Sequence, residues 1–102
     1  MSVIKITKDN FNEVTKTDKR VLIDLYADWC GPCRMVGPIV EELAEEHPEY
    51  VFGKVNVDEE GELAMRFRVM SIPMLVVLED GEVVASAVGA RPKASILELL
   101  EG

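Results

Sequence analysis

The sequence predicts an α/β fold, with a central mixed sheet of about five strands flanked by four helices. Three observations support this prediction. Apolar strand-like segments alternate with amphipathic helical segments along the chain. Residues 21–27 are almost continuously apolar, as in a central strand that is covered on both faces. Asp80-Gly81 is a strong hairpin signal. With 102 residues, 48% of them hydrophobic, we expect a single domain, 1–102, around one core.

The N-terminal part predicts a strand, a helix and a second strand. Residues 3–6 form a short apolar strand. Thr7 or Asp9 can cap a helix that runs to about Lys16. A polar turn then leads into the buried strand at 21–27.

The longest predicted helix covers residues 33–47. Pro38 lies inside it and should produce a kink, because proline removes a donor and clashes with the preceding turn. His47, near the helix end, is expected to be a favourable cation or a surface group. The residues expected to face the core are Met35, Val36, Ile39, Val40, Leu43 and Ala44.

The second half of the chain predicts three further strands and two helices. Residues 50–57 form a strand in which Lys54 is the unusual member. The remaining elements are a short helix at 62–67, a buried strand at 74–78, an antiparallel return at 82–88, and a last helix with Pro92 in its first turn.

Composition excludes some classes of function. The chain carries 11 basic and 19 acidic residues, a net charge of −8, and no basic cluster, so we expect no nucleic-acid partner. No apolar run approaches the ~20 residues of a membrane span. Residues 1–6 lack the apolar stretch of a signal peptide, which predicts a cytoplasmic protein.

Both cysteines lie in the stretch Trp29-Cys30-Gly31-Pro32-Cys33, between a strand end and a helix start. A helix N-terminus stabilises a thiolate and makes it a nucleophile. A purely structural disulfide is less plausible, because closing so short a loop contributes only about 2 kcal/mol. Structural zinc needs four ligands, and the chain has no second cysteine pair. We therefore expect redox chemistry, with no metal and no bound cofactor.

The whole chain resembles the thioredoxin family. This resemblance implies the thioredoxin fold and a thiol–disulfide oxidoreductase that reduces protein disulfides through a Cys30–Cys33 disulfide. It also implies protein disulfide substrates and a flavoprotein reductase that uses NADPH as the electron donor; we expect a monomer. The residues that carry the resemblance are Asp24, the stretch 29–33, Pro38, Lys54, Ile72-Pro73, Asp80-Gly81 and Gly89.

The two cysteines have different expected roles. Cys30 precedes the helix, so its sulfur should face solvent and attack the substrate disulfide. Cys33 should be more buried and act as the resolving thiol. Gly31 and Pro32 hold the bend between them, and Trp29 is interpreted as a rim residue, with a core position as the alternative.

Asp24 interrupts an apolar strand and should be desolvated, which raises its pKa. It could be a structural hydrogen-bond acceptor, or face water, or accept the Cys33 proton through a water molecule; the resemblance favours the last role. Lys54 is either its partner or a solvated strand-edge lysine.

The resemblance also implies a substrate-binding turn. Pro73 is expected to be a cis proline that presents the Ile72 backbone to an extended substrate chain. Met74 and Gly89 are expected to complete the substrate-binding groove with Trp29. Four residues depart from the bacterial family pattern and leave substrate preference and reductase pairing open: Tyr26, Arg34, Ser71 and Met74.

Two alternative functions remain at this stage. The first is an oxidase or isomerase domain, which Gly31-Pro32 between the cysteines disfavours. The second is a binding module with idle thiols, which the complete cysteine pair disfavours. Turnover of a protein disulfide distinguishes the binding module from both redox functions.

Overall fold

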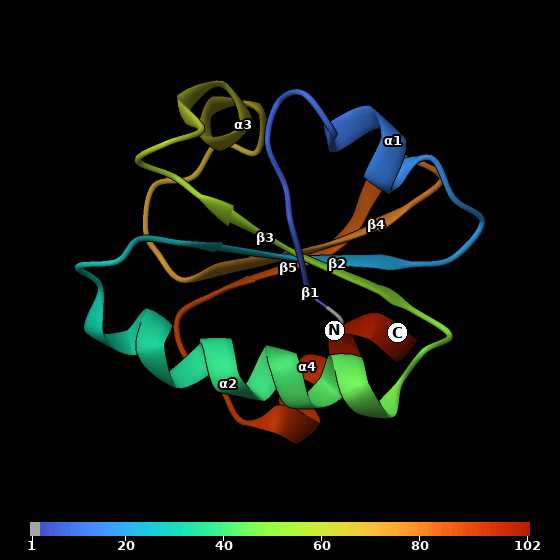
Figure 1. The fold of residues 1–102 in the computed structure, drawn as a ribbon. Coiled ribbons are helices and arrows are strands. Elements are labelled where there is room, and N and C mark those ends of the chain that lie inside the picture. Colours follow the sequence, from blue (N-terminus) through green and yellow to red (C-terminus); the bar gives the residue numbers. More distant parts are fainter. Residues whose placement is uncertain (1–2) are drawn as a thin grey trace.

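The computed structural model describes residues 3–102, which form one five-stranded mixed sheet between two pairs of helices (Figure 1). The strands are β1 (Val3–Lys5), β2 (Val21–Tyr26), β3 (Val51–Asn56), β4 (Met74–Glu79) and β5 (Glu82–Val88). The helices are α1 (Phe11–Thr15), α2 (Gly31–Glu46), α3 (Gly61–Arg66) and α4 (Lys93–Glu101). The predicted α/β architecture is thus confirmed.

The sheet has the strand order β1-β3-β2-β4-β5. β2 lies in the centre, parallel to β3 and antiparallel to β4. The near-continuous apolar sequence of β2 follows from this position, because both of its faces are covered.

Alternate residues of each strand face opposite layers. Ile23 and Leu25 belong to the core beneath α1 and α3, whereas Leu22 belongs to the core formed with α2 and α4. Figure 1 shows these two layers, with α1 and α3 above the sheet and α2 and α4 below it. Asp24 has the same parity as Leu22, so it points toward α2.

The β4–β5 hairpin uses the predicted Asp80-Gly81 turn. Both residues have positive φ, 54° and 80°. Turns with two positive φ angles match the twist of paired strands, and asparagine, aspartate and glycine favour them.

Several sequence-based boundaries and caps were wrong. α1 begins after Asn10, not after a capping Thr7 or Asp9. The Asn10 side chain instead accepts from Thr7 N–H and donates to the Lys5 carbonyl, which stabilises the preceding loop. α2 begins at Gly31, earlier than Cys33, because Cys30 already occupies its N-cap position.

Two expectations for the helices also need correction. Met35 is 66% exposed, because the core-facing stripe of α2 consists of Val36, Val40, Leu43 and Ala44. One residue along an α-helix corresponds to a rotation of roughly 100°, which places Met35 beside that stripe. Pro92 is the N-cap of α4 and does not lie in its first turn.

Candidate active site

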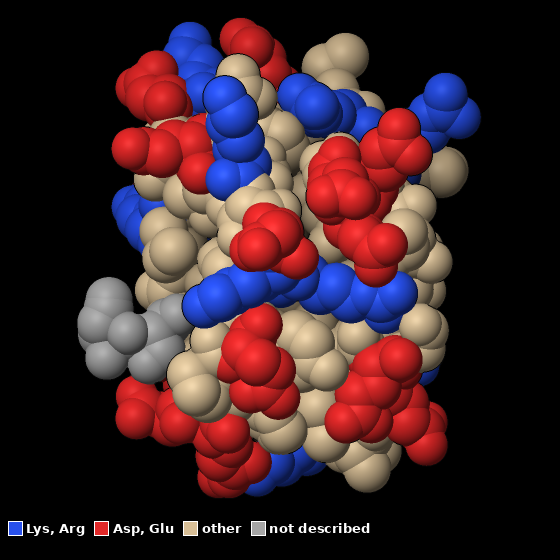
Figure 2. All heavy atoms as spheres, turned by 90° about the vertical axis from the view of Figure 1, so that its right-hand side faces the viewer, with Lys and Arg blue, Asp and Glu red and all other residues tan. Residues whose placement is uncertain are grey.

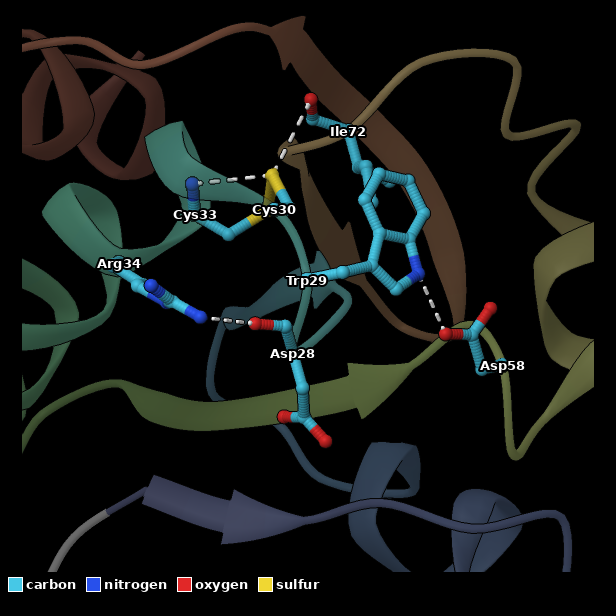
Figure 3. The surroundings of a disulfide bond; sticks show 7 residues. All are labelled: Asp28, Trp29, Cys30, Cys33, Arg34, Asp58 and Ile72. Atoms are coloured by element: carbon cyan, nitrogen blue, oxygen red, sulfur yellow. Dashed lines mark hydrogen bonds between the residues drawn. A yellow bond between two sulfur atoms is a disulfide. The ribbon is translucent and has the colours of Figure 1, made fainter.

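The cysteine pair lies where β2 passes into α2, at one end of the sheet (Figure 3). Cys30 has an extended backbone and is the N-cap residue of α2. Its sulfur accepts a hydrogen bond from Cys33 N–H at 3.2 Å. The two residues form a disulfide, with their Cα atoms 5.3 Å apart. The Cys33 N–H of the first helical turn therefore points at the Cys30 sulfur, where it would stabilise a thiolate.

The expected difference in exposure between the two cysteines is not found in the disulfide form. Cys30 is 4% exposed and Cys33 is 5% exposed. The Ile72 carbonyl oxygen lies 3.9 Å from the Cys30 sulfur (Figure 3), and Tyr26 and Val57 also pack on this small cluster. The sequence could not predict this contact, because Ile72 is 42 positions away from Cys30 in the sequence.

Trp29 lies at the rim of the site, as expected, with 69% of its surface exposed. Its indole N–H donates to Asp58 Oδ2 at 2.8 Å, and Asp58 follows the end of β3 (Figure 3). Asp58 was missed in the sequence. The available signal was its position directly after a strand that runs parallel to β2, which places it at the same edge of the sheet.

A hollow of about 440 Å³ adjoins Trp29. Met70 is 94% exposed at this hollow and was also missed. Met74 does not line it; this residue is half-buried and packs on the core beneath α1 and α3. The lining residues are Trp29, Val57, Ala64, Val69, Met70, Ser71 and Ile72.

The loop before β4 contains Ile72 and covers the cysteine pair. The Ile72–Pro73 peptide bond is cis, as the sequence resemblance implied. Gly89 N–H donates to the Pro73 carbonyl at 2.8 Å, so the loop that follows β5 is joined to the cis-proline loop. Gly89 has φ of 98°, a conformation that favours glycine. Pro73 and Gly89 are therefore in direct contact, next to Ile72 in the cis-proline loop.

Asp24 is buried beneath the cysteine pair, with 4% of its surface exposed. Burial raises its pKa from 3.8 to about 7, and the positive charge of Lys54 acts in the opposite direction. Its Oδ1 atom accepts no hydrogen bond from the residues the structure describes. Neither a solvated carboxylate nor a fully satisfied structural one fits these observations.

A cavity of about 100 Å³ connects Asp24 with Cys33. Lys54 also lines it, from the neighbouring strand position on β3, and its Nζ lies 6.0 Å from the centre of the Tyr26 ring. Lys54 is thus half-buried on an inner strand, which contradicts the solvated edge-strand alternative. The cavity residues are Val3, Asp24, Tyr26, Cys33, Gly37, Val40, Glu41 and Lys54.

The remaining predicted residues lie at the start of α2. Gly31 and Pro32 are exposed and form its first turn. Arg34 donates from Nη2 to the Asp28 carbonyl at 3.0 Å, which joins the helix to the loop before it (Figure 3). Within residues 3–102, no group of three or more His, Cys, Asp or Glu residues is placed to hold a metal ion. None of the helices in that range has the length and hydropathy needed to cross a membrane.

Comparison with known proteins gives one consistent result. Residues 2–102 match the sequence model of the family Thioredoxin. The thioredoxin of Bacillus subtilis is 45% identical over 101 residues, which cover 98% of this chain and 96% of that protein. The thioredoxin of Staphylococcus haemolyticus is 42% identical over 102 residues, covering 99% and 97% of the two chains.

Solved structures agree with these relatives. A mutant thioredoxin from Halobacterium salinarum superimposes with a TM-score of 0.92 at 38% identity, covering 98% of this chain and 88% of that one. The thioredoxin of Malassezia sympodialis gives a TM-score of 0.89 at 35% identity, with 98% and 90% coverage. Fold and sequence therefore point to the same family.

Proposed function

The chain belongs to the thioredoxin family, and from this premise we propose that Cys30 is the nucleophile and Cys33 the resolving thiol of its redox reaction. The family and the disulfide-forming cysteine pair make the protein a thiol–disulfide oxidoreductase that reduces protein disulfides. One observation carries the assignment of roles. The Cys30 sulfur occupies the N-cap of α2 and accepts the Cys33 N–H, so a negative charge is stabilised on Cys30.

The reaction takes place in two exchanges. The Cys30 thiolate attacks one sulfur of the substrate disulfide, that disulfide breaks, and the other substrate sulfur leaves as a thiolate that takes a proton from solvent. Cys33 then loses its proton and attacks the Cys30 sulfur. The bond between Cys30 and the substrate breaks, the second substrate thiolate leaves and is protonated, and the Cys30–Cys33 disulfide remains. The two electrons of the dithiol have passed to the substrate.

Asp24 accepts the proton of Cys33 in the second exchange. A carboxyl with a pKa of about 7 is well matched to this transfer at neutral pH. The cavity between the two side chains supports a transfer through water. Lys54, which lines the same cavity, moderates the burial effect on the Asp24 pKa and so keeps part of the population ionised.

The substrate chain binds across the rim that covers the disulfide. Trp29 and Ile72 line the hollow beside it, and the Ile72 carbonyl lies over the Cys30 sulfur. An extended substrate segment can form main-chain hydrogen bonds with such a loop. Pro73 and Gly89 fix the position of Ile72 through the Gly89–Pro73 hydrogen bond. Met74 supports the loop from the core side.

A reductase returns the oxidised protein to the dithiol state, as in its family. We propose, from the family to which the chain belongs, that this partner is a flavoprotein that takes electrons from NADPH. A protein that has to be kept reduced works best in a reducing compartment, which supports a cytoplasmic location. We further propose that it acts as a monomer.

Trapping of intermediates tests the roles of the two cysteines. Cys33→Ser should accumulate a mixed disulfide with an oxidised protein substrate, because Cys30 still attacks and nothing resolves the adduct. Cys30→Ser should trap no substrate and reduce none. The adducts can be measured by non-reducing electrophoresis and mass spectrometry. Adducts on the Cys30→Ser variant alone would reverse the assignment.

A further inference from the structure

We infer that Gly37 is a positioning residue that keeps the cavity between Asp24 and Cys33 open to solvent, so that water can carry the proton between these groups and bulk. This inference rests on the proposed function and concerns the second exchange only. It assigns a role to a residue that touches neither the substrate nor the reacting sulfur atoms.

The first observation is the position of Gly37 in α2. It lies in the middle of a continuous helix, where glycine is among the least favourable residues. Close packing does not require a glycine there. A Cβ atom at this position would meet nothing within 4 Å. The missing side chain therefore leaves space that a larger residue could fill.

The second observation is where this space lies. Cys33, Gly37 and Glu41 follow one another at intervals of four residues, so they line one face of α2. All three line the cavity of about 100 Å³ that also contains Asp24. Along this face of α2 the exposure increases from buried Cys33, through half-buried Gly37, to exposed Glu41. On the α2 side of the cavity, Gly37 thus lies between buried Cys33 and exposed Glu41.

The third observation is that the cavity suits water. A water molecule needs roughly 10–15 Å³ and two to four polar partners. The cavity is larger than this minimum, Asp24 lines it, and the Oδ1 atom of Asp24 accepts no hydrogen bond from the described residues. The titratable groups around the cavity come from three elements: Asp24 and Tyr26 from β2, Lys54 from β3, and Cys33 and Glu41 from α2.

The chemistry requires such a route. When Asp24 takes the Cys33 proton it becomes neutral, and it has to lose that proton before the next cycle. The proton passes to water in the cavity and then to bulk solvent, so no other acceptor is needed. A side chain at position 37 would displace this water and desolvate the carboxylate further. Both effects hold Asp24 in its protonated form.

The test measures the two exchanges separately. The reduced protein is mixed with an excess of an aromatic disulfide that releases a coloured thiolate. Attack by Cys30 releases the first equivalent, and attack by Cys33 releases the second. Gly37→Ala and Gly37→Leu should leave the first phase unchanged. At neutral pH the rate of the second phase should fall about threefold in Gly37→Ala and about tenfold in Gly37→Leu. Both decreases are smaller than the roughly 10²-fold rate enhancement that a proton-transferring side chain supplies.

The pH dependence separates this role from a structural one. The midpoint, which is the pH at which the second phase reaches half of its maximal rate, should rise in both variants. The rise should be larger in Gly37→Leu than in Gly37→Ala. Gly61→Leu is the matched control, because Gly61 is also helical with nothing within 4 Å of a Cβ and lies outside the cavity. This control should keep the parent rates and midpoint. If Gly37→Leu does not fold, Gly37→Ala decides the question.

Two results would overturn the inference. One is an unchanged second phase and midpoint in the folded Gly37 variants. The other is an equal slowing of both phases, which would indicate a general disturbance of the site. A parent protein that releases no second equivalent would contradict the proposed function itself, so the two failures can be distinguished.

Discussion

At the scale of single residues, Asp24 has opposite effects on stability and on chemistry. Its burial beneath the cysteine pair raises its pKa to about 7, so its ionised form is unfavourable in the folded state. The same property suits it to the role we propose for it, which is to accept the Cys33 proton near neutral pH. A residue that is optimal for stability at this position would be apolar or neutral. In the proposed mechanism, the carboxylate therefore lowers the stability of the folded state and serves the second exchange.

Asp24→Asn should stabilise the oxidised protein at neutral and alkaline pH. A carboxyl whose pKa is higher in the folded than in the unfolded state makes the folded state bind more protons, so stability falls as pH rises from about 4 to about 7. At about 1.4 kcal/mol per pKa unit, the gain at pH 8 should be on the order of 2–4 kcal/mol. Denaturant unfolding at several pH values measures it.

The control for this prediction is Asp9→Asn, which removes an exposed carboxylate. Its stability should change by no more than about 0.5 kcal/mol at any pH. At pH 3, Asp24→Asn should also lie close to the parent protein, because Asp24 is then protonated in both states. A variant that is equally stable or less stable at pH 8 would mean that the charge of Asp24 is compensated in the folded protein.

At the scale of elements, the β4–β5 hairpin depends on one turn residue. Gly81 has φ of 80°, which a side chain disfavours. Gly81→Ala should therefore lower the free energy of unfolding by about 1 kcal/mol while disulfide reduction stays normal. Gly61→Ala is the matched control without a positive φ and should be neutral or slightly stabilising. Equal effects of the two substitutions in denaturant unfolding would contradict this explanation.

Local signals explain which elements could be predicted. The apolar run of β2 and the Asp80-Gly81 turn each carry enough information within a few residues. The exact cap of α1 could not be predicted, because Asn10 forms hydrogen bonds with the preceding loop and not with the helix. Helix ends are decided by such small competing interactions.

The site was predictable in its chemistry and less so in its geometry. The sequence around Cys30 and Cys33 indicated the redox pair, and the interruption of an apolar strand indicated Asp24 as a buried carboxyl. The burial of Cys30 depends on Ile72, and the orientation of Trp29 depends on Asp58. Both contacts join distant parts of the chain, and no local pattern encodes them.

At the scale of the whole molecule, acidic residues dominate. The net charge is −8 at neutral pH. Figure 2 shows the end of the molecule away from the disulfide, where acidic side chains lie above and below a band of basic ones. A strong net charge affects how fast partners approach more than it affects the fold. Long-range attraction of this kind is screened by salt.

Reduction of cationic disulfide peptides should therefore depend on ionic strength. For a peptide rich in lysine, kcat/KM should be at least about tenfold higher at low salt than at high salt, because the negative protein attracts it. A peptide of the same length with glutamate in place of lysine is the matched control, and its kcat/KM should rise with salt. The same salt response for both peptides would show that local contacts, not net charge, determine association.

The disulfide closes a ring that extends only from residue 30 to residue 33. Opening so small a ring releases little chain, so we expect the oxidised and reduced proteins to share one outline. The overall shape then does not tell a partner whether the protein is in its dithiol or its disulfide state. That state is stored in a single bond beneath the rim of Trp29 and Ile72. A partner can distinguish the two redox states only by direct contact with the sulfur atoms. For this protein, recognition of the redox state and reaction with it therefore occur in the same step.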